Sequence, residues 1–113
     1  MPPREWRFRM QDILDAIERV ETYTAGMTLA AFEANGLVVD AVARNLGIIG
    51  EAARYVPDEV ASSDPSIPWP RIRAMRNFLI HVYHGVRLRT VWETVRDDLP
   101  PLKEKLRALI GEA

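Results

Sequence analysis

The stretch RNFLIHVYHG, residues 76–85, carries side chains suited to phosphodiester chemistry. The unperturbed pKa of histidine is about 6.5, so His81 could take the proton of a ribose 2′-hydroxyl or protonate a leaving oxygen near neutral pH. Arg76 could donate two parallel hydrogen bonds to a phosphorane and stabilise its negative charge. Asn77 follows directly and could orient the histidine or the phosphate. These residue types are those that RNA cleavage by its own 2′-hydroxyl requires.

The same residues also have plainer interpretations. A single histidine near a helix end is more often a capping or packing residue than a catalytic one. His81 and His84 have the three-residue spacing of a metal pair, but no carboxylate follows before Glu93, so we expect no metal site and no cofactor. Tyr83 could be an ordinary boundary aromatic with its hydroxyl pointing outward.

Positive charge is concentrated around this stretch. Residues 65–92 contain five arginines and no Asp or Glu, whereas the rest of the chain holds ten Lys or Arg against sixteen Asp or Glu. The net charge is only −1, so the chain as a whole is not a polyanion binder. The basic segment alone would suit a ligand that carries phosphate, although five solvated surface arginines would give the same pattern.

Apolar residues at spacings of three and four predict the helices that position this stretch. We expect long helices over residues 5–25 and 37–56, a third from Pro68 or Pro70 toward His81, and a last one from about Leu88 to the chain end. The fold class is therefore all-α, an antiparallel bundle of four to five helices in a single domain over residues 1–113.

Turn and breaker residues indicate where these helices end. Gly26 and Pro57 are placed to end the first two long helices, and Thr28 to start a short helical turn between them. His84-Gly85 is expected to end or bend the third helix. Pro100 and Pro101 are expected to kink or break the last one.

Helical geometry favours a site shared between two chains. Five residues at about 100° each put Arg76 and His81 about 140° apart around a straight helix. They do not share a narrow stripe, but two such pairs facing each other across a two-fold axis could form one cleft. Arg76 and Tyr83 are seven residues apart and would share a face if the helix reached that far.

Three segments together resemble one family. The spacing Arg76–His81–Tyr83 with Asn77, the segment RNLGIIGEA at residues 44–52, and VWETVRDDLPPL at residues 91–102 occur in the order seen in HEPN toxins of HEPN/MNT toxin–antitoxin pairs, the HepT-like ribonucleases. The resemblance implies a metal-independent RNase and a homodimer whose catalytic Arg76 and His81 line a shared cleft. It also implies a partner, an MNT-type nucleotidyltransferase antitoxin that adenylylates Tyr83.

The resemblance also bears on the helix over residues 37–56. Asp40, Arg44, Gly47, Glu51 and Arg54 form a stripe opposite its core face, and an ion-paired solvated face is the simpler interpretation for Asp40 and Arg54. Because Arg44 and Glu51 lie in the matching segment, they are candidate cleft or interface residues. Gly47 and Gly50 could let another helix approach closely. Trp69 and Trp92 are expected in the core or at a dimer interface.

One position departs from the family. A Val-Asp pair commonly leads into the last helix, and here Val86-Arg87 stands there, which puts a cation where an N-capping carboxylate is favourable. This departure bears on where that helix begins.

Two other functions fit parts of the sequence. A catalytically silent HEPN dimer could only dock or regulate a nucleotidyltransferase, and a bare helical adaptor would explain the core but not the acid-free basic segment.

Residues 1–10 do not resemble a signal peptide, no stretch approaches the roughly 20 apolar residues of a membrane span, and there are no cysteines. We therefore expect a cytoplasmic protein without a membrane partner.

Overall fold

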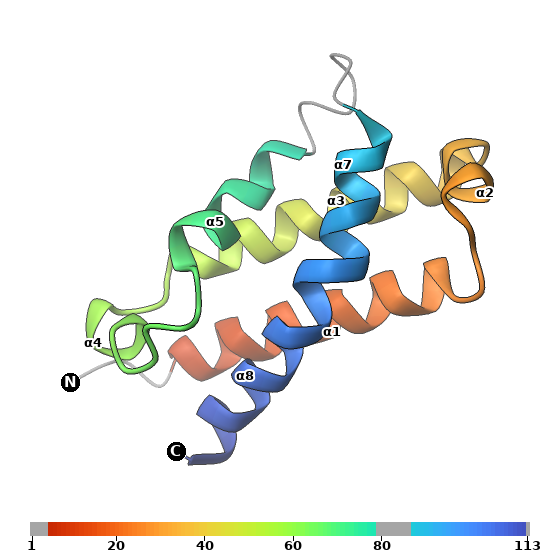
Figure 1. Ribbon diagram of the computed structural model, residues 1–113. Coiled ribbons are helices and arrows are strands. Elements are labelled where there is room, and N and C mark those ends of the chain that lie inside the picture. Colours follow the sequence, from red (N-terminus) through yellow and green to blue (C-terminus); the bar gives the residue numbers. More distant parts are fainter. Residues whose placement is uncertain (1–4, 79–86, 113) are drawn as a thin grey trace.

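A computed structural model describes residues 5–78 and 87–112, and every regular element within these ranges is helical (Figure 1). The longest helices are α1 (Glu5–Thr24), α3 (Gly36–Ala53) and α8 (Leu99–Glu112). The all-α prediction is therefore confirmed. No described helix is long and apolar enough to cross a membrane.

Helices α1 and α3 run antiparallel and form the centre of the fold (Figure 1). Gly26 follows α1 with a positive φ of 73°, a conformation that glycine adopts without strain, so the predicted stop is confirmed. The short helix α2 (Leu29–Glu33) lies between them, and the Thr28 hydroxyl accepts a hydrogen bond from the Ala31 backbone N–H at 3.1 Å. Asn35 caps α3 in the same way.

The predicted third helix begins as expected and then tightens. After the single turn α4 (Asp58–Ala61), α5 (Trp69–Arg73) starts with Pro70 in its first turn and continues as a 3₁₀ turn, η1 (Ala74–Arg76). Trp69, Ile72 and Met75 are spaced three residues apart along α5 and η1, so they lie on the same buried side. The predicted continuation to His81 and the end at His84-Gly85 lie outside the described residues.

The last helical segment changes its winding just before the two prolines. The chain stays helical from α7 (Leu88–Glu93) through a wide π-helical turn, η3 (Thr94–Asp98), into α8. Pro100 and Pro101 therefore do not end the helical run, but the regular α-helix is interrupted directly before them, which agrees with the expected kink or break. Their missing N–H groups fall in the first turn of α8, and the wide turn just before them relieves the clash that their rings would cause in a regular helix. Leu88 starts α7 as predicted, although Arg87 provides no side-chain cap.

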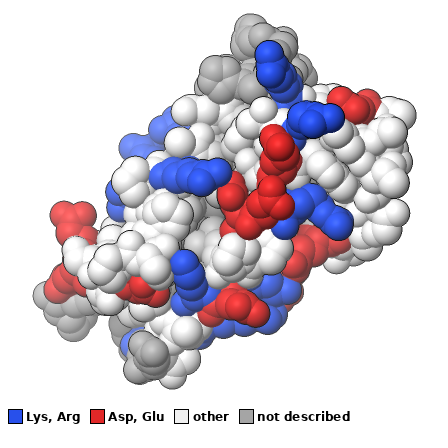
Figure 2. Space-filling model, viewed as in Figure 1, with Lys and Arg blue, Asp and Glu red and all other residues white. Residues whose placement is uncertain are grey.

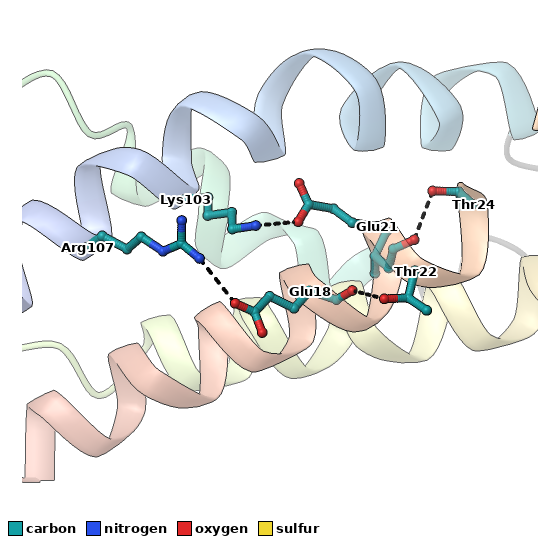
Figure 3. Close-up of polar contacts among 7 residues, drawn as sticks. Glu18, Glu21, Thr22, Thr24, Lys103 and Arg107 are labelled. Carbon is teal, nitrogen blue, oxygen red and sulfur yellow. Dashed lines mark hydrogen bonds and ion pairs between the residues drawn. The ribbon is translucent and has the colours of Figure 1, made fainter. Parts of the chain in front are cut away.

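The core fills the space between these helices. The segment α7–η3–α8 crosses α1 and α3 on one side, and α5 with η1 packs on the carboxyl-terminal half of α3 (Figure 1). Figure 3 shows how α8 is tied to α1: Lys103 contacts Glu21 at 2.6 Å and Arg107 contacts Glu18 at 3.2 Å. The largest fully buried side chains are Phe32, Met10, Ile13, Ile17, Leu46, Ile49, Ile72, Leu99 and Leu106.

Candidate active site

Arg76 is the last residue of η1 and its side chain is 49% exposed. The residue before it, Met75, is buried in the core, so the backbone of the turn is anchored while the guanidinium reaches outward. Asn77 follows and is exposed. A cation held on a fixed backbone and open to solvent is suited to receive a phosphate group.

Gly50 of α3 allows the turn of Arg76 to lie directly on this helix. A Cβ placed on Gly50 would overlap the backbone nitrogen of Arg76, and it would lie 2.8 Å from the Arg73 carbonyl oxygen and 3.0 Å from the Arg76 Cβ. Only glycine lets the two backbones come so close. The predicted close approach is therefore confirmed at Gly50, and the position of Arg76 depends on it.

Glu51 is the acidic neighbour of Arg76. One of its carboxylate oxygens lies 4.0 Å from Nε of Arg76, and the other accepts from Nη1 of Arg54 at 3.1 Å. Both ion pairs are about half exposed to solvent. Glu51 thus lies beside the candidate catalytic arginine, and the predicted ion-paired interpretation of Arg54 is confirmed.

Arg44 lies elsewhere on α3. It is exposed and lines a hollow of about 500 Å³ between α1 and α3, together with Tyr23, Leu37 and Asp40. Arg44 and Glu51 are two helical turns apart, about 10 Å along the axis. Within one chain the structure therefore brings Glu51 to Arg76 and leaves Arg44 in this separate hollow.

Two further arginines, Arg71 and Arg73, tie the basic segment to neighbouring helices. Nε of Arg73 donates to the Ala53 carbonyl at 3.3 Å, which satisfies an acceptor at the end of α3, and Arg71 pairs with Asp98 of η3 at 2.9 Å. In Figure 2, basic side chains lie over α5 and η1, and acidic side chains gather over η3. Sequence reasoning missed these roles, because neither partner is close in sequence.

The two tryptophans are placed mainly as expected. Trp69 is buried in the core, and among the described residues its indole N–H has no hydrogen-bond partner. Trp92 is half-buried, and its ring lies 5.2 Å from the ring of Phe32 between centroids. Both contact the protein's own side chains, so neither offers a stacking platform to a ligand.

The remaining predicted site residues, His81 and Tyr83, lie outside the described residues, as does His84. Among the described residues no group of three or more His, Asp or Glu is arranged to hold a metal ion. The described part of the site is thus an arginine on a fixed turn, an exposed asparagine and a neighbouring carboxylate.

Comparison with known proteins places this arrangement in a family. A family model for HepT-like ribonucleases matches residues 13–109, which is most of the chain. The chain belongs to the HepT-like ribonuclease family. A protein of Thermococcus cleftensis named "Probable ribonuclease HepT" is 40% identical over 100 residues, which cover 88% of this chain and 91% of that protein.

A second relative of the family, named "Putative RNase", comes from Methanocaldococcus jannaschii. It is 34% identical over 112 residues, covering 99% of this chain and 93% of that protein. No solved structure gives a significant match. The predicted resemblance to HepT-like ribonucleases is confirmed, and the matched range includes Arg44, Glu51, Arg76, His81 and Tyr83.

Proposed function

We propose that this protein is a metal-independent endoribonuclease, the toxin of a type VII-like HEPN/MNT toxin–antitoxin pair that acts in the cytoplasm. The observation that carries the proposal is the placement of Arg76. Its backbone is locked against Gly50 while its guanidinium stays half exposed. His81 follows five residues later in a chain of the HepT-like ribonuclease family.

The proposed reaction is a transesterification. The ribose 2′-oxygen attacks the adjacent phosphorus while its proton passes to a histidine, and the bond from phosphorus to the 5′-oxygen breaks as that oxygen receives a proton. The products are a 2′,3′-cyclic phosphate and a 5′-hydroxyl. Arg76 stabilises the pentavalent phosphorane through paired hydrogen bonds, and Asn77 supports its orientation.

His81 alone can perform only one of the two proton transfers within a single chain. A homodimer supplies both, since His81 of one subunit could act as the base and His81 of the other as the acid. Neither role needs a metal ion or a cofactor, because histidine titrates near neutral pH. The composite cleft is therefore part of the proposal.

The proposed regulation acts on Tyr83. Its phenolic oxygen attacks the α-phosphorus of ATP in the active site of an MNT-type nucleotidyltransferase, and pyrophosphate leaves while the phenolic proton is released. The new phosphodiester brings a negative charge and acceptor oxygens that can pair with Arg76. It would occupy the place of the RNA phosphate.

Product analysis tests the reaction class. The purified protein is incubated with single-stranded RNA in EDTA, and the fragment ends are identified by mass. The proposal expects cleavage with 2′,3′-cyclic phosphate ends. Loss of cleavage in EDTA with recovery on adding a divalent ion would instead favour a metal site at His81 and His84.

The second candidate function is a catalytically silent dimer that docks a nucleotidyltransferase. The ion pair between Glu51 and Arg76 is the observation that favours it, because a carboxylate beside Arg76 competes with an RNA phosphate for the guanidinium. Incubation with single-stranded RNA in EDTA distinguishes the ribonuclease from the silent dimer. A silent dimer would leave RNA intact at every enzyme concentration while still binding its partner.

A further inference from the structure

The outward side of α3 is not covered by any other described helix. Helices α1 and α5–η1 pack against its flanks, and α7–η3–α8 crosses on the opposite side (Figure 1). Leu37 at the start of this side is 82% exposed and Tyr55 just beyond its end is 53% exposed. These two apolar side chains lie at opposite ends of α3, and the exposed residues between them are mainly charged.

Four charges alternate in sign along this surface, in the order Asp40, Arg44, Glu51 and Arg54. Laid antiparallel against a copy of itself, with the two-fold axis between residues 47 and 48, the surface places Arg44 opposite the partner's Glu51. It also brings Asp40 within one residue of the position opposite the partner's Arg54. A parallel arrangement would set each charge against its own kind. The order of the charges therefore favours a second copy of this chain, packed antiparallel, as the partner that covers this surface.

We propose that α3 packs antiparallel on α3 of a second copy, so that each subunit's Arg44 pairs with Glu51 of the other and completes its Arg76 site. This inference rests on the proposed function, since it assigns the face and the register of the homodimer in which the shared cleft forms.

The shape of the surface agrees with this register. Gly47 has no side chain and Ile48 is half-buried, so the helices can approach closely at the axis. Asp40 comes opposite the partner's Tyr55 in the same register. The hollow of about 500 Å³ lined by Tyr23, Leu37 and Asp40 is placed to receive that ring. Arg9 stacks on Tyr55, 4.2 Å from the ring centroid, and holds the aromatic ring in place.

The pairing has a consequence for the arginine of the site. In a single chain Glu51 lies 4.0 Å from Nε of Arg76 and neutralises part of its charge. In the dimer Arg44 of the other subunit draws the same carboxylate across the interface, and Arg76 becomes free to bind a phosphate. Each Glu51 lies about 5 Å along the helix from the axis, so the two arginine sites are close enough to share one cleft.

Charge reversal tests the register. Arg44→Glu and Glu51→Arg each place like charges together twice per dimer, so we expect each variant alone to raise the dimer dissociation constant about 10-fold or more. Mixing the two variants restores both opposite-charge pairs in a heterodimer, and native mass spectrometry should detect it as the main species. Glu104→Arg on the exposed side of α8 is the matched control and should leave the dimer intact.

Cross-linking gives a measurement that does not depend on charge variants folding. The chain has no cysteine, so Ile48→Cys introduces a single thiol next to the proposed axis. A short bismaleimide should join two chains at this position, and Ala108→Cys on α8 should stay uncoupled. A dimer that resists both charge reversals and does not cross-link through Ile48→Cys overturns the proposal, and so does a chain that is monomeric at micromolar concentration.

The two proposals fail separately. If mixing restores the heterodimer and no RNA is cut, the interface stands and the ribonuclease proposal fails. If RNA is cut by a dimer that ignores the charge reversals, the ribonuclease proposal stands and this interface is wrong.

Discussion

Nε of Arg76 lies 4.0 Å from a carboxylate oxygen of Glu51, whereas Nη1 of Arg54 lies 3.1 Å from the other oxygen of the same carboxylate. Arg54 is therefore the closer partner. Half-exposed ion pairs of this kind contribute little free energy because solvent screens them. A phosphate group could take the place of Glu51 beside Arg76 at small cost, while Arg54 keeps the carboxylate in position.

Replacing Arg76 tests whether its charge is used in catalysis. We expect Arg76→Ala to lower the rate of RNA cleavage by about 10²–10³-fold, the usual effect of removing a group that stabilises charge in the transition state. Arg76→Lys should recover only part of it, since an ammonium cannot offer two parallel hydrogen bonds. Initial rates on one RNA substrate measure both.

Arg71→Ala is the matched control for this substitution. Arg71 lies in the same basic segment but pairs with Asp98, so its loss should change the rate far less. Circular dichroism should show the helices of both variants intact, because both side chains are largely outside the core. Equal rates for Arg76→Ala and the unaltered protein would remove Arg76 from the mechanism.

Gly50→Ala tests the close approach of α3 and η1. The added methyl group would overlap the backbone of Arg76, and overpacking against stiff backbone costs about 1–3 kcal/mol of unfolding free energy. We also expect slower RNA cleavage, since the turn that carries Arg76 must shift. Urea unfolding and initial rates measure the two effects.

Gly111 provides the control for Gly50. It lies in α8 with nothing within 4 Å of an added Cβ, so Gly111→Ala should leave stability unchanged or raise it by up to about 1 kcal/mol. A Gly50→Ala protein that is as stable and as active as the Gly111→Ala protein would mean that the close approach does not position Arg76.

Tyr83 is the predicted site of modification. Co-expression with the neighbouring nucleotidyltransferase gene should add one or more adenylyl groups, visible in the intact mass, and modified protein should lose RNA binding as well as cleavage. Tyr83→Phe should stay unmodified and remain toxic, whereas Tyr23→Phe, a control on α1, should be modified normally. Full inhibition with an unmodified Tyr83 would show that the antitoxin acts by covering the site.

Asp64 offers a prediction about pH. Hydrogen bonds from the side chain and the backbone N–H of Ser66 hold the pKa of its carboxyl below the ordinary value. A lowered pKa in the folded state means that this turn stabilises the protein above the unfolded pKa and that the contribution is lost as the pH falls through the folded value. Ser66→Ala should raise the pKa of Asp64, and an NMR titration of the carboxyl carbon would measure it. An unchanged titration curve would contradict this assignment.

Much of the fold follows from local patterns. The apolar spacing, Gly26 after α1 and Pro70 at the start of α5 each indicated an element that the structure contains. The π-helical turn before Pro100 was not predicted, because proline indicates strain but not how neighbouring residues relieve it. The 3₁₀ turn of Arg76 was also missed, since the contact with Gly50 that shapes it joins residues distant in sequence.

The site was predicted in part. Glu51 was a candidate cleft residue and lies beside Arg76, but the spacing along α3 could not show that Arg44, two turns away, belongs to a separate hollow of the same chain. That distinction depends on which neighbouring helix packs on each flank of α3. It becomes visible only when α1 and η1 are in place.

The most direct measurement is RNA cleavage in EDTA by His81→Ala beside its matched variant His84→Ala. If His81 transfers protons in the reaction, its loss lowers the rate about 10²–10⁴-fold, while His84→Ala cuts RNA at close to the original rate. Equal loss in both variants, restored by a divalent ion, would contradict the account in favour of a metal pair. Undiminished cleavage by His81→Ala would contradict it outright.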